Sequence, residues 1–142
     1  MAQNYSNHRR WVPVYHFVLS LMVLATMIGA GINFFKAMGG TGFYSASLLF
    51  VTSLSMLITF FLFRAFALKA QDRAIRAEEN LRHFAMTGKL LDSKLTTRQI
   101  IGLRFASDDE FQELAEKAVS ENMSEDNIKK AVKNWKPDNY RA

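Results

Sequence analysis

The sequence predicts an all-α membrane protein: a two-helix transmembrane hairpin with its second helix extended into the cytoplasm, followed by a C-terminal bundle of about three short helices. Two uncharged stretches, 14–35 and 43–63, are each long enough to cross the hydrocarbon core as a helix, at about 1.5 Å per residue. Only the glycine-rich segment 36–42 separates them. From residue 64 onward the composition changes to Ala, Arg, Lys and Glu, which suits a helix in water.

The first element in this prediction is a cytoplasmic N-terminal segment, residues 1–12, followed by a transmembrane helix over 13–36. Pro13 suits a first helical turn because its missing amide hydrogen would have no partner there, and Trp11 suits a head-group interface. A cleaved signal peptide is the alternative interpretation. We reject it because the apolar run exceeds the usual signal core and continues beyond the small residues at 29–31.

The short loop 37–42 permits only an antiparallel hairpin, so the second transmembrane helix, 43–64, returns the chain to its starting side, and 13–64 forms one hairpin domain. Basic residues flank the hairpin at its open end, whereas Lys36 alone adjoins the loop. The positive-inside rule therefore predicts a multi-pass membrane protein with both termini in the cytoplasm.

Small and weakly polar residues recur on one side of each apolar helix. Small residues let helix backbones approach closely, and hydroxyl groups in lipid seek a partner on another helix. The expected transmembrane contact residues are Ala25, Gly29, Ser45, Thr52, Ser55 and Thr59. The favoured interpretation is that they pack the hairpin on itself, and the alternatives are contact within an oligomer or the lining of a pore.

The segment 65–88 is predicted to continue the second helix into the cytoplasm, and Gly88 is expected to end it. Apolar residues recur along it at the spacing 3-4-3-4-3, which is typical of a short coiled-coil face. This helix-packing seam consists of Ala67, Ala70, Ala74, Ala77, Leu81 and Phe84. Two interpretations remain open: the seam receives the protein's own C-terminal helices, or it forms a coiled coil with another copy or another protein.

The remaining residues, 89–142, are predicted to form a small helical module with three helix starts. Capping boxes are predicted at Thr96–Gln99 and Ser107–Glu110, and Ser124 is a third cap, followed by a helix whose apolar face extends to Trp135 and which Pro137 ends. Such short helices need a platform, because they bury little area alone. The residues expected to act as tail core or as an exposed anchor are Phe111, Leu114, Ile128 and Trp135.

Charge is distributed unevenly in this chain of net charge +5. Residues 64–104 contain nine Lys and Arg against four Asp and Glu, whereas 105–142 contain six against nine. Anionic head groups are therefore the expected partners of four basic residues next to the membrane, Arg64, Lys69, Arg73 and Arg76. Nucleic acid is not an expected partner, because the part farthest from the membrane is acidic.

The sequence contains no motif for catalysis, for a cofactor or for a metal ion. It has no cysteine, its three histidines make no ligand pair, and the glycines at 39–42 follow no strand as a phosphate loop would require. The acids at 108–110 suit the first turn of a helix without a metal. We therefore expect a protein that is not an enzyme and that has no cofactor.

Two tail stretches, Leu95-Thr-Thr-Arg-Gln-Ile-Ile-Gly-Leu-Arg-Phe-Ala-Ser-Asp-Asp-Glu-Phe111 and Ile128-Lys-Lys-Ala-Val-Lys-Asn-Trp-Lys-Pro-Asp-Asn-Tyr-Arg141, follow a hairpin that opens with Asn4-Tyr5-Ser6-Asn7-His8. Together they resemble a family of small two-span bacterial inner-membrane proteins of unknown function. The resemblance implies a topology and a bacterial source, and it implies no functional residue. The expected function is that of a non-enzymatic accessory or scaffolding subunit that binds other subunits or itself, and a homo-oligomeric channel is the alternative.

Overall fold

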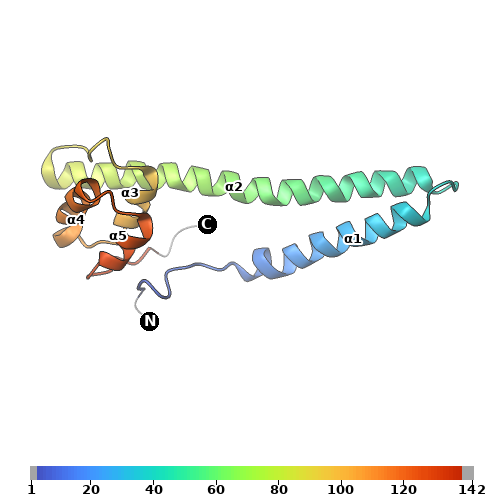
Figure 1. Ribbon diagram of the computed structural model, residues 1–142, viewed down its shortest axis with the longest axis horizontal. Coiled ribbons are helices and arrows are strands. Elements are labelled where there is room, and N and C mark those ends of the chain that lie inside the picture. The colour runs from blue at the N-terminus through green and yellow to red at the C-terminus, as the bar shows by residue number, and fades with distance from the viewer. Residues whose placement is uncertain (1–2, 139–142) are drawn as a thin grey trace. The chain divides into compact units, whose positions relative to one another are not determined.

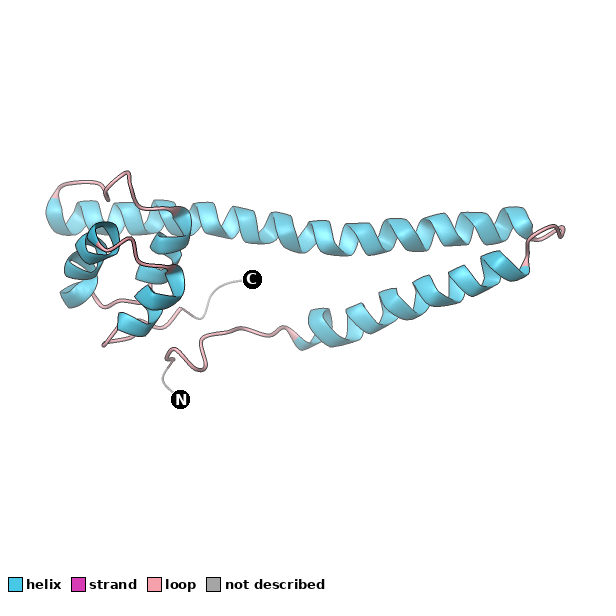
Figure 2. Cartoon of the chain, viewed as in Figure 1, coloured by secondary structure: helices cyan, strands magenta, loops and turns pink. Residues whose placement is uncertain are grey.

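The computed structural model describes residues 3–138, and all the regular structure in that range is helical (Figures 1 and 2). A short π-helix, η1 (Val14–Leu19), runs directly into α1 (Ser20–Lys36), and a tight turn leads to the long α2 (Phe43–Thr87). Three short helices follow, α3 (Thr97–Leu103), α4 (Asp108–Ser120) and α5 (Glu125–Ala131). The predicted fold class, a hairpin of two long apolar helices followed by three short helices, is confirmed.

The chain forms two compact units, and α2 contributes to both. The first consists of residues 10–66 and contains the hairpin. The second combines the N-terminal residues up to Arg9 with residues 67 onward, so that the last part of α2 belongs to the same unit as α3, α4 and α5.

Aromatic contacts hold the two helices of the hairpin together at both ends. Near its open end the Tyr15 ring stacks on Phe60 with centroids 4.6 Å apart, and the Tyr15 hydroxyl donates to the Phe60 carbonyl at 2.7 Å. Near the loop, Phe34 packs against Phe43 and Phe50, each at 5.2 Å between ring centroids. These contacts join helices that the short loop had already forced to be antiparallel.

Most of the hairpin's apolar surface is exposed. The stretches Val14–Lys36 and Phe43–Thr87 are long and apolar enough to cross a membrane, and only 11% of the most apolar part of each is buried. A core helix of a soluble protein would be mostly buried instead. Two exposed apolar helices of this length are consistent with a membrane protein.

The helix α2 is continuous over 45 residues and ends where the sequence predicted. Gly88 follows its last residue with φ of +73°, a left-handed conformation that a glycine adopts without steric cost, and its amide donates to the Phe84 carbonyl at 2.8 Å. The chain then turns back, so that α3, α4 and α5 gather beside the last turns of α2 (Figure 1).

Two of the three predicted helix caps are confirmed and one is wrong. Thr96 and Gln99 form a complete capping box at α3, and Ser124 accepts from the Asn127 amide at α5. Ser107 precedes α4 but makes no side-chain cap. Glu110, its expected partner, accepts from the amides of Lys133 and Asn134 at 3.0 and 2.9 Å, because those amides have no helical acceptor.

The predicted third tail helix is also too long. The helix α5 ends at Ala131, Val132 is extended, and Trp135 lies in a short antiparallel bridge with Ala106 instead of on a helix. The bridge is completed by hydrogen bonds from the Ser107 amide to Asn134 and from the Lys136 amide to Phe105. The apolar spacing from Ile128 to Trp135 therefore does not come from one helix. An extended segment after α5 places Val132 and Trp135 against the same core.

Candidate partner-binding site

The tail module docks on one face of the last turns of α2. This docking face consists of Ile75, Glu79 and Arg82, at the spacing of four and three residues that places them on one side of a helix. Ile75 is 5% exposed and Glu79 is 8% exposed, although both belong to a helix whose neighbouring residues are mostly exposed. The platform that the short helices require is therefore part of α2.

Arg82 is the main polar contact of this docking face. Its guanidinium pairs with the Glu79 carboxylate at 3.0 Å, with the Asp108 carboxylate at 2.6 Å and with the Ala106 carbonyl at 2.7 Å. The same group lies 4.3 Å from the centre of the Phe111 ring, and the Arg82 side chain is only 11% exposed. The Arg82 side chain thus contacts Asp108 at the start of α4, the Phe111 ring in the tail core and the Ala106 carbonyl in the turn before α4.

The hydrogen bond from Arg82 to Asp108, together with the nearby guanidinium charge, lowers the pKa of the Asp108 carboxyl below its usual range. Asp108 lies in the first turn of α4, where a negative charge is also favoured by the helix dipole. The carboxylate is therefore charged at neutral pH and serves as an anion for the docking arginine.

The tail encloses an apolar core, and the four predicted core or anchor residues are all part of it or next to it. Phe111, Leu114 and Ile128 are buried in the core, and Trp135 is half-buried against it. The Trp135 ring lies 4.8 Å from the Phe105 ring. Gly102 allows α3 and α5 to approach closely, since a Cβ there would meet the Glu125 carbonyl at 3.0 Å.

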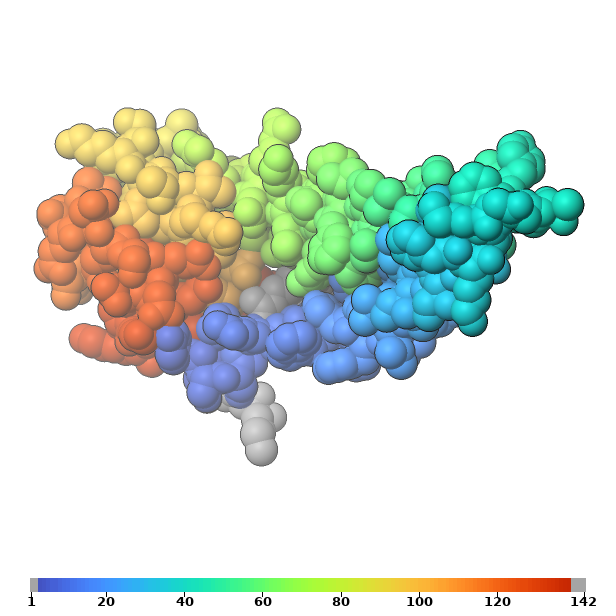
Figure 3. Space-filling view, turned by 45° about the vertical axis from the view of Figure 1, so that its right-hand side comes forward, coloured from blue at the N-terminus to red at the C-terminus, as the bar shows by residue number. Residues whose placement is uncertain are grey.

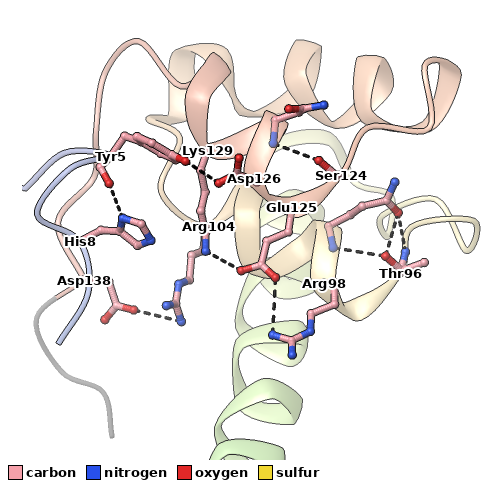
Figure 4. A network of polar contacts seen from close by, with 12 residues as sticks. Tyr5, His8, Thr96, Arg98, Arg104, Ser124, Glu125, Asp126, Lys129 and Asp138 are labelled. Atoms are coloured by element: carbon pink, nitrogen blue, oxygen red, sulfur yellow. Dashed lines mark hydrogen bonds and ion pairs between the residues drawn. The ribbon is translucent and has the colours of Figure 1, made fainter. Parts of the chain in front are cut away.

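The N-terminal segment covers this core from outside, a contact that the sequence analysis missed. The Tyr5 hydroxyl donates to the Asp126 carboxylate at 2.6 Å (Figure 4). The His8 ring lies 5.8 Å from both Phe105 and Trp135. In the space-filling view, the blue atoms of this segment lie against the red atoms of the C-terminal helices (Figure 3). An aromatic residue and a histidine within a polar segment were the only signal available in the sequence.

A network of polar contacts closes the same side of the tail (Figure 4). The Arg104 side chain, which is 8% exposed, forms an ion pair with Asp138 at 3.2 Å. Glu125 forms ion pairs with both Arg98 and Lys129. The Lys130 ammonium and then the Tyr5 hydroxyl lower the pKa of the exposed Asp126 carboxyl. These contacts join the N-terminal segment to α5, and α5 to α3.

The seam, by contrast, is exposed along its whole length. All six of its members are exposed, with Leu81 at 67% and Phe84 at 51%: Ala67, Ala70, Ala74, Ala77, Leu81 and Phe84. The docking face lies on the other side of α2. The interpretation in which the seam receives the protein's own C-terminal helices is therefore wrong, because Ile75, Glu79 and Arg82 receive them instead.

The predicted transmembrane contact residues also face away from the hairpin interface. All six are exposed: Ala25, Gly29, Ser45, Thr52, Ser55 and Thr59. The hairpin interface is made by other residues, among them Val23, Ala46 and Ser53, which are buried. The interpretation that the six residues pack the hairpin on itself is wrong, because other small residues, Ala46 and Ser53, and a set of aromatic rings occupy that interface. Their role in contacts with other chains stays a prediction.

In the part of the chain that the structure describes, no group of three or more His, Asp or Glu side chains is placed to hold a metal ion. The basic residues expected to meet lipid are distributed along α2. Lys69, Arg73 and Arg76 are exposed, and the Arg64 guanidinium lies 5.6 Å from the centre of the Tyr15 ring. Within the described residues, the seam is an exposed apolar strip along the last part of α2.

Comparison with known proteins gives a family and no activity. Neither the curated proteins nor the solved structures contain a match to this chain. One family model matches residues 1–142, and its description is a family of unknown function, DUF6526. A match along the whole sequence establishes membership, so this chain belongs to the DUF6526 family.

Proposed function

We propose that this protein is a non-enzymatic accessory or scaffolding subunit of a bacterial inner-membrane assembly, anchored by its hairpin and binding partners through α2. The observation that carries the proposal is the exposed seam on a helix whose docking face is already occupied. The chain binds its tail with Ile75, Glu79 and Arg82 and leaves Leu81 and Phe84 in contact with solvent. Exposed apolar side chains at coiled-coil spacing are typical of a helix that pairs with another helix.

The proposed orientation follows from the basic residues at the open end of the hairpin. Arg9 and Arg10 precede the first span, and Arg64 and Lys69 follow the exposed apolar part of the second, whereas Lys36 alone adjoins the loop. Cytoplasmic termini satisfy the positive-inside rule. In this orientation Arg64 and Lys69 lie at the level of anionic head groups, each contributing about 1 kcal/mol to membrane association.

A homo-oligomeric channel is the second candidate function, favoured by one observation. Ser45, Thr52, Ser55 and Thr59 are exposed on α2, away from the hairpin interface. Hydroxyl groups within a membrane can bond to a partner helix or to water, or to their own helix, as Ser55 does to the Val51 carbonyl at 2.9 Å. In a ring of hairpins, these hydroxyl groups would contact water in a central pore. With a partner subunit, they would contact a helix of that subunit instead.

One preparation tests both functions. The full chain, expressed at native level and purified in a mild detergent, should bring other membrane proteins in stoichiometric amounts, as measured by mass spectrometry. A variant carrying Ala74→Glu, which places a charge on the seam, should lose those proteins while remaining in the membrane. Purification of the chain alone, together with conductance in planar bilayers that Thr52→Val alters, would contradict the scaffold function and support the channel.

A further inference from the structure

The seam has the residue pattern of a two-stranded coiled coil when α2 is written as heptads. Ala67, Ala74 and Leu81 occupy position a, and Ala70, Ala77 and Phe84 occupy position d. The docking face falls on the outer positions b and f, which hold Ile75, Glu79 and Arg82. The tail therefore docks mainly on the side of α2 that a coiled coil leaves free, and its residues 136–138 border the seam at Ala74 and Glu78, which line the same hollow.

The flanks of the seam carry one opposite-charge pair in the correct geometry for self-association. In a parallel coiled coil, position g of one helix faces position e of the other helix five residues further on. Arg73 occupies g and Glu78 occupies e, five residues later, and both are exposed. A second copy in the same register would place Arg73 of each chain against Glu78 of the other, so that the two-fold axis produces the pair twice.

The other flanking pairs contain no charge that would oppose this register. Phe66 would face Gln71 of the second copy, and Asn80 would face Ala85. Like charges at these positions would have favoured a different partner. The flanks are thus self-complementary at their one charged pair, Arg73 with Glu78.

The distance from the membrane also leaves Arg73 available for this pair. At about 1.5 Å per residue, Arg73 lies roughly 14 Å along α2 from Arg64, beyond a head-group layer of about 5–8 Å. Lys69 therefore stays near the lipid head groups, whereas Arg73, which the sequence analysis also assigned to them, lies in water with Glu78. Two copies inserted in one membrane in the same orientation also present their α2 helices in parallel.

We propose that residues 66–85 of α2 form a parallel two-stranded coiled coil with the same segment of a second copy of this chain, in the register set by reciprocal Arg73–Glu78 pairs. The alanines at a and d allow the two backbones to approach closely, and Leu81 and Phe84 become buried at the end of the seam. This inference deepens the proposed scaffold function and rests on its membrane anchoring: the scaffold is a dimer before it meets other subunits.

The absence of native cysteine allows a direct test in membranes with the full chain. Ala77→Cys places a thiol at position d, and Arg76→Cys places a matched thiol one residue away on the outer surface. Mild oxidation should give a disulfide-linked dimer of the chain with Ala77→Cys, and about tenfold less dimer with Arg76→Cys, because position d meets itself across the two-fold axis and position c does not. Equal yields from the two variants would overturn the proposal.

Charge reversal tests the register within the Ala77→Cys background. Arg73→Glu and Glu78→Arg should each lower the dimer yield about five- to tenfold, since two exposed ion pairs become repulsive contacts. The combined reversal, Arg73→Glu with Glu78→Arg, should restore the yield because the pairs re-form with opposite polarity. Failure of the combined reversal to restore the yield would overturn this register even if both single variants are weakened.

The outcomes separate this proposal from the proposed function. Cross-linking of Ala77→Cys to a different protein, with no homodimer, would overturn the dimer and leave the scaffold function standing. A homodimer whose purification brings no other membrane protein would support the dimer and contradict the scaffold function. Mass spectrometry of the cross-linked band distinguishes these results.

Discussion

Substitution of Arg82 by methionine should release the tail from α2 while the hairpin stays inserted. Methionine retains the apolar length of the side chain and removes the guanidinium, which is 2.6 Å from Asp108, 3.0 Å from Glu79 and 2.7 Å from the Ala106 carbonyl. The exposed pair with Asp108 contributes about 1 kcal/mol at most. The two other groups are buried, and leaving each without its donor costs about 1–3 kcal/mol.

The sum is a loss of about 2–7 kcal/mol, a range that includes the whole stability of a small helical unit. The assay is hydrogen exchange of the full chain in detergent, read at the amides of α4, with limited proteolysis after Gly88 as a second measurement. Arg76→Met is the matched control, because Arg76 is an exposed arginine on the same helix, and it should change the free energy of unfolding by less than about 0.5 kcal/mol.

A second substitution separates the charge effect from the packing effect. Glu79→Met in the Arg82→Met background removes the carboxylate that the first change left buried without its partner, so it should recover about 2 kcal/mol. Unchanged exchange protection of α4 in Arg82→Met would refute the reasoning, because it would mean that the apolar core alone holds the tail on α2.

Three further predictions concern the tail and the topology. Trp135→Ala should destabilise the tail by about 2–4 kcal/mol and expose Phe105 and His8, as measured by proteolysis after Gly88. Lys133→Ala, in the same extended segment, should have little effect. Unchanged proteolysis of Trp135→Ala would show that Trp135 is an exposed anchor. Because the pKa of Asp108 is lowered in the folded state, its contribution to stability should be complete above about pH 4, the ordinary value for aspartate, and should be lost as the pH falls through the lowered value. Asp108→Asn should remove that part of the acid dependence in denaturant titrations, and an identical pH profile for the two proteins would contradict it. For the topology, a cysteine at Thr41 should react with an impermeant reagent added outside intact cells and one at Ser93 should not, so labelling at Ser93 would reverse the orientation.

Patterns of charge and hydrophobicity were sufficient to predict the architecture. The two uncharged stretches, the glycine-rich loop and Gly88 placed α1 and α2, because helix length and helix ends depend on local chemistry that the sequence displays. Local chemistry also predicted the caps at Thr96 and Ser124. The cap at Ser107 failed because a distant segment, Lys133–Asn134, competes for the Glu110 carboxylate.

The sequence by itself determined the two long apolar helices, the spacing of the seam and the apolar residues of the tail core. Only the tertiary structure decided which side of α2 the tail covers. In the sequence, Glu79 and Arg82 have the charges of a solvent-exposed surface. They form the docking face because the fold places the carboxylate of Asp108 and the carbonyl of Ala106 beside Arg82. It also decided that Tyr5 and His8 cover the tail core, since no local pattern joins residues more than 100 positions apart. Periodicity identifies an apolar face, but the partner of that face depends on which buried polar groups can satisfy one another, and that is a property of the folded chain.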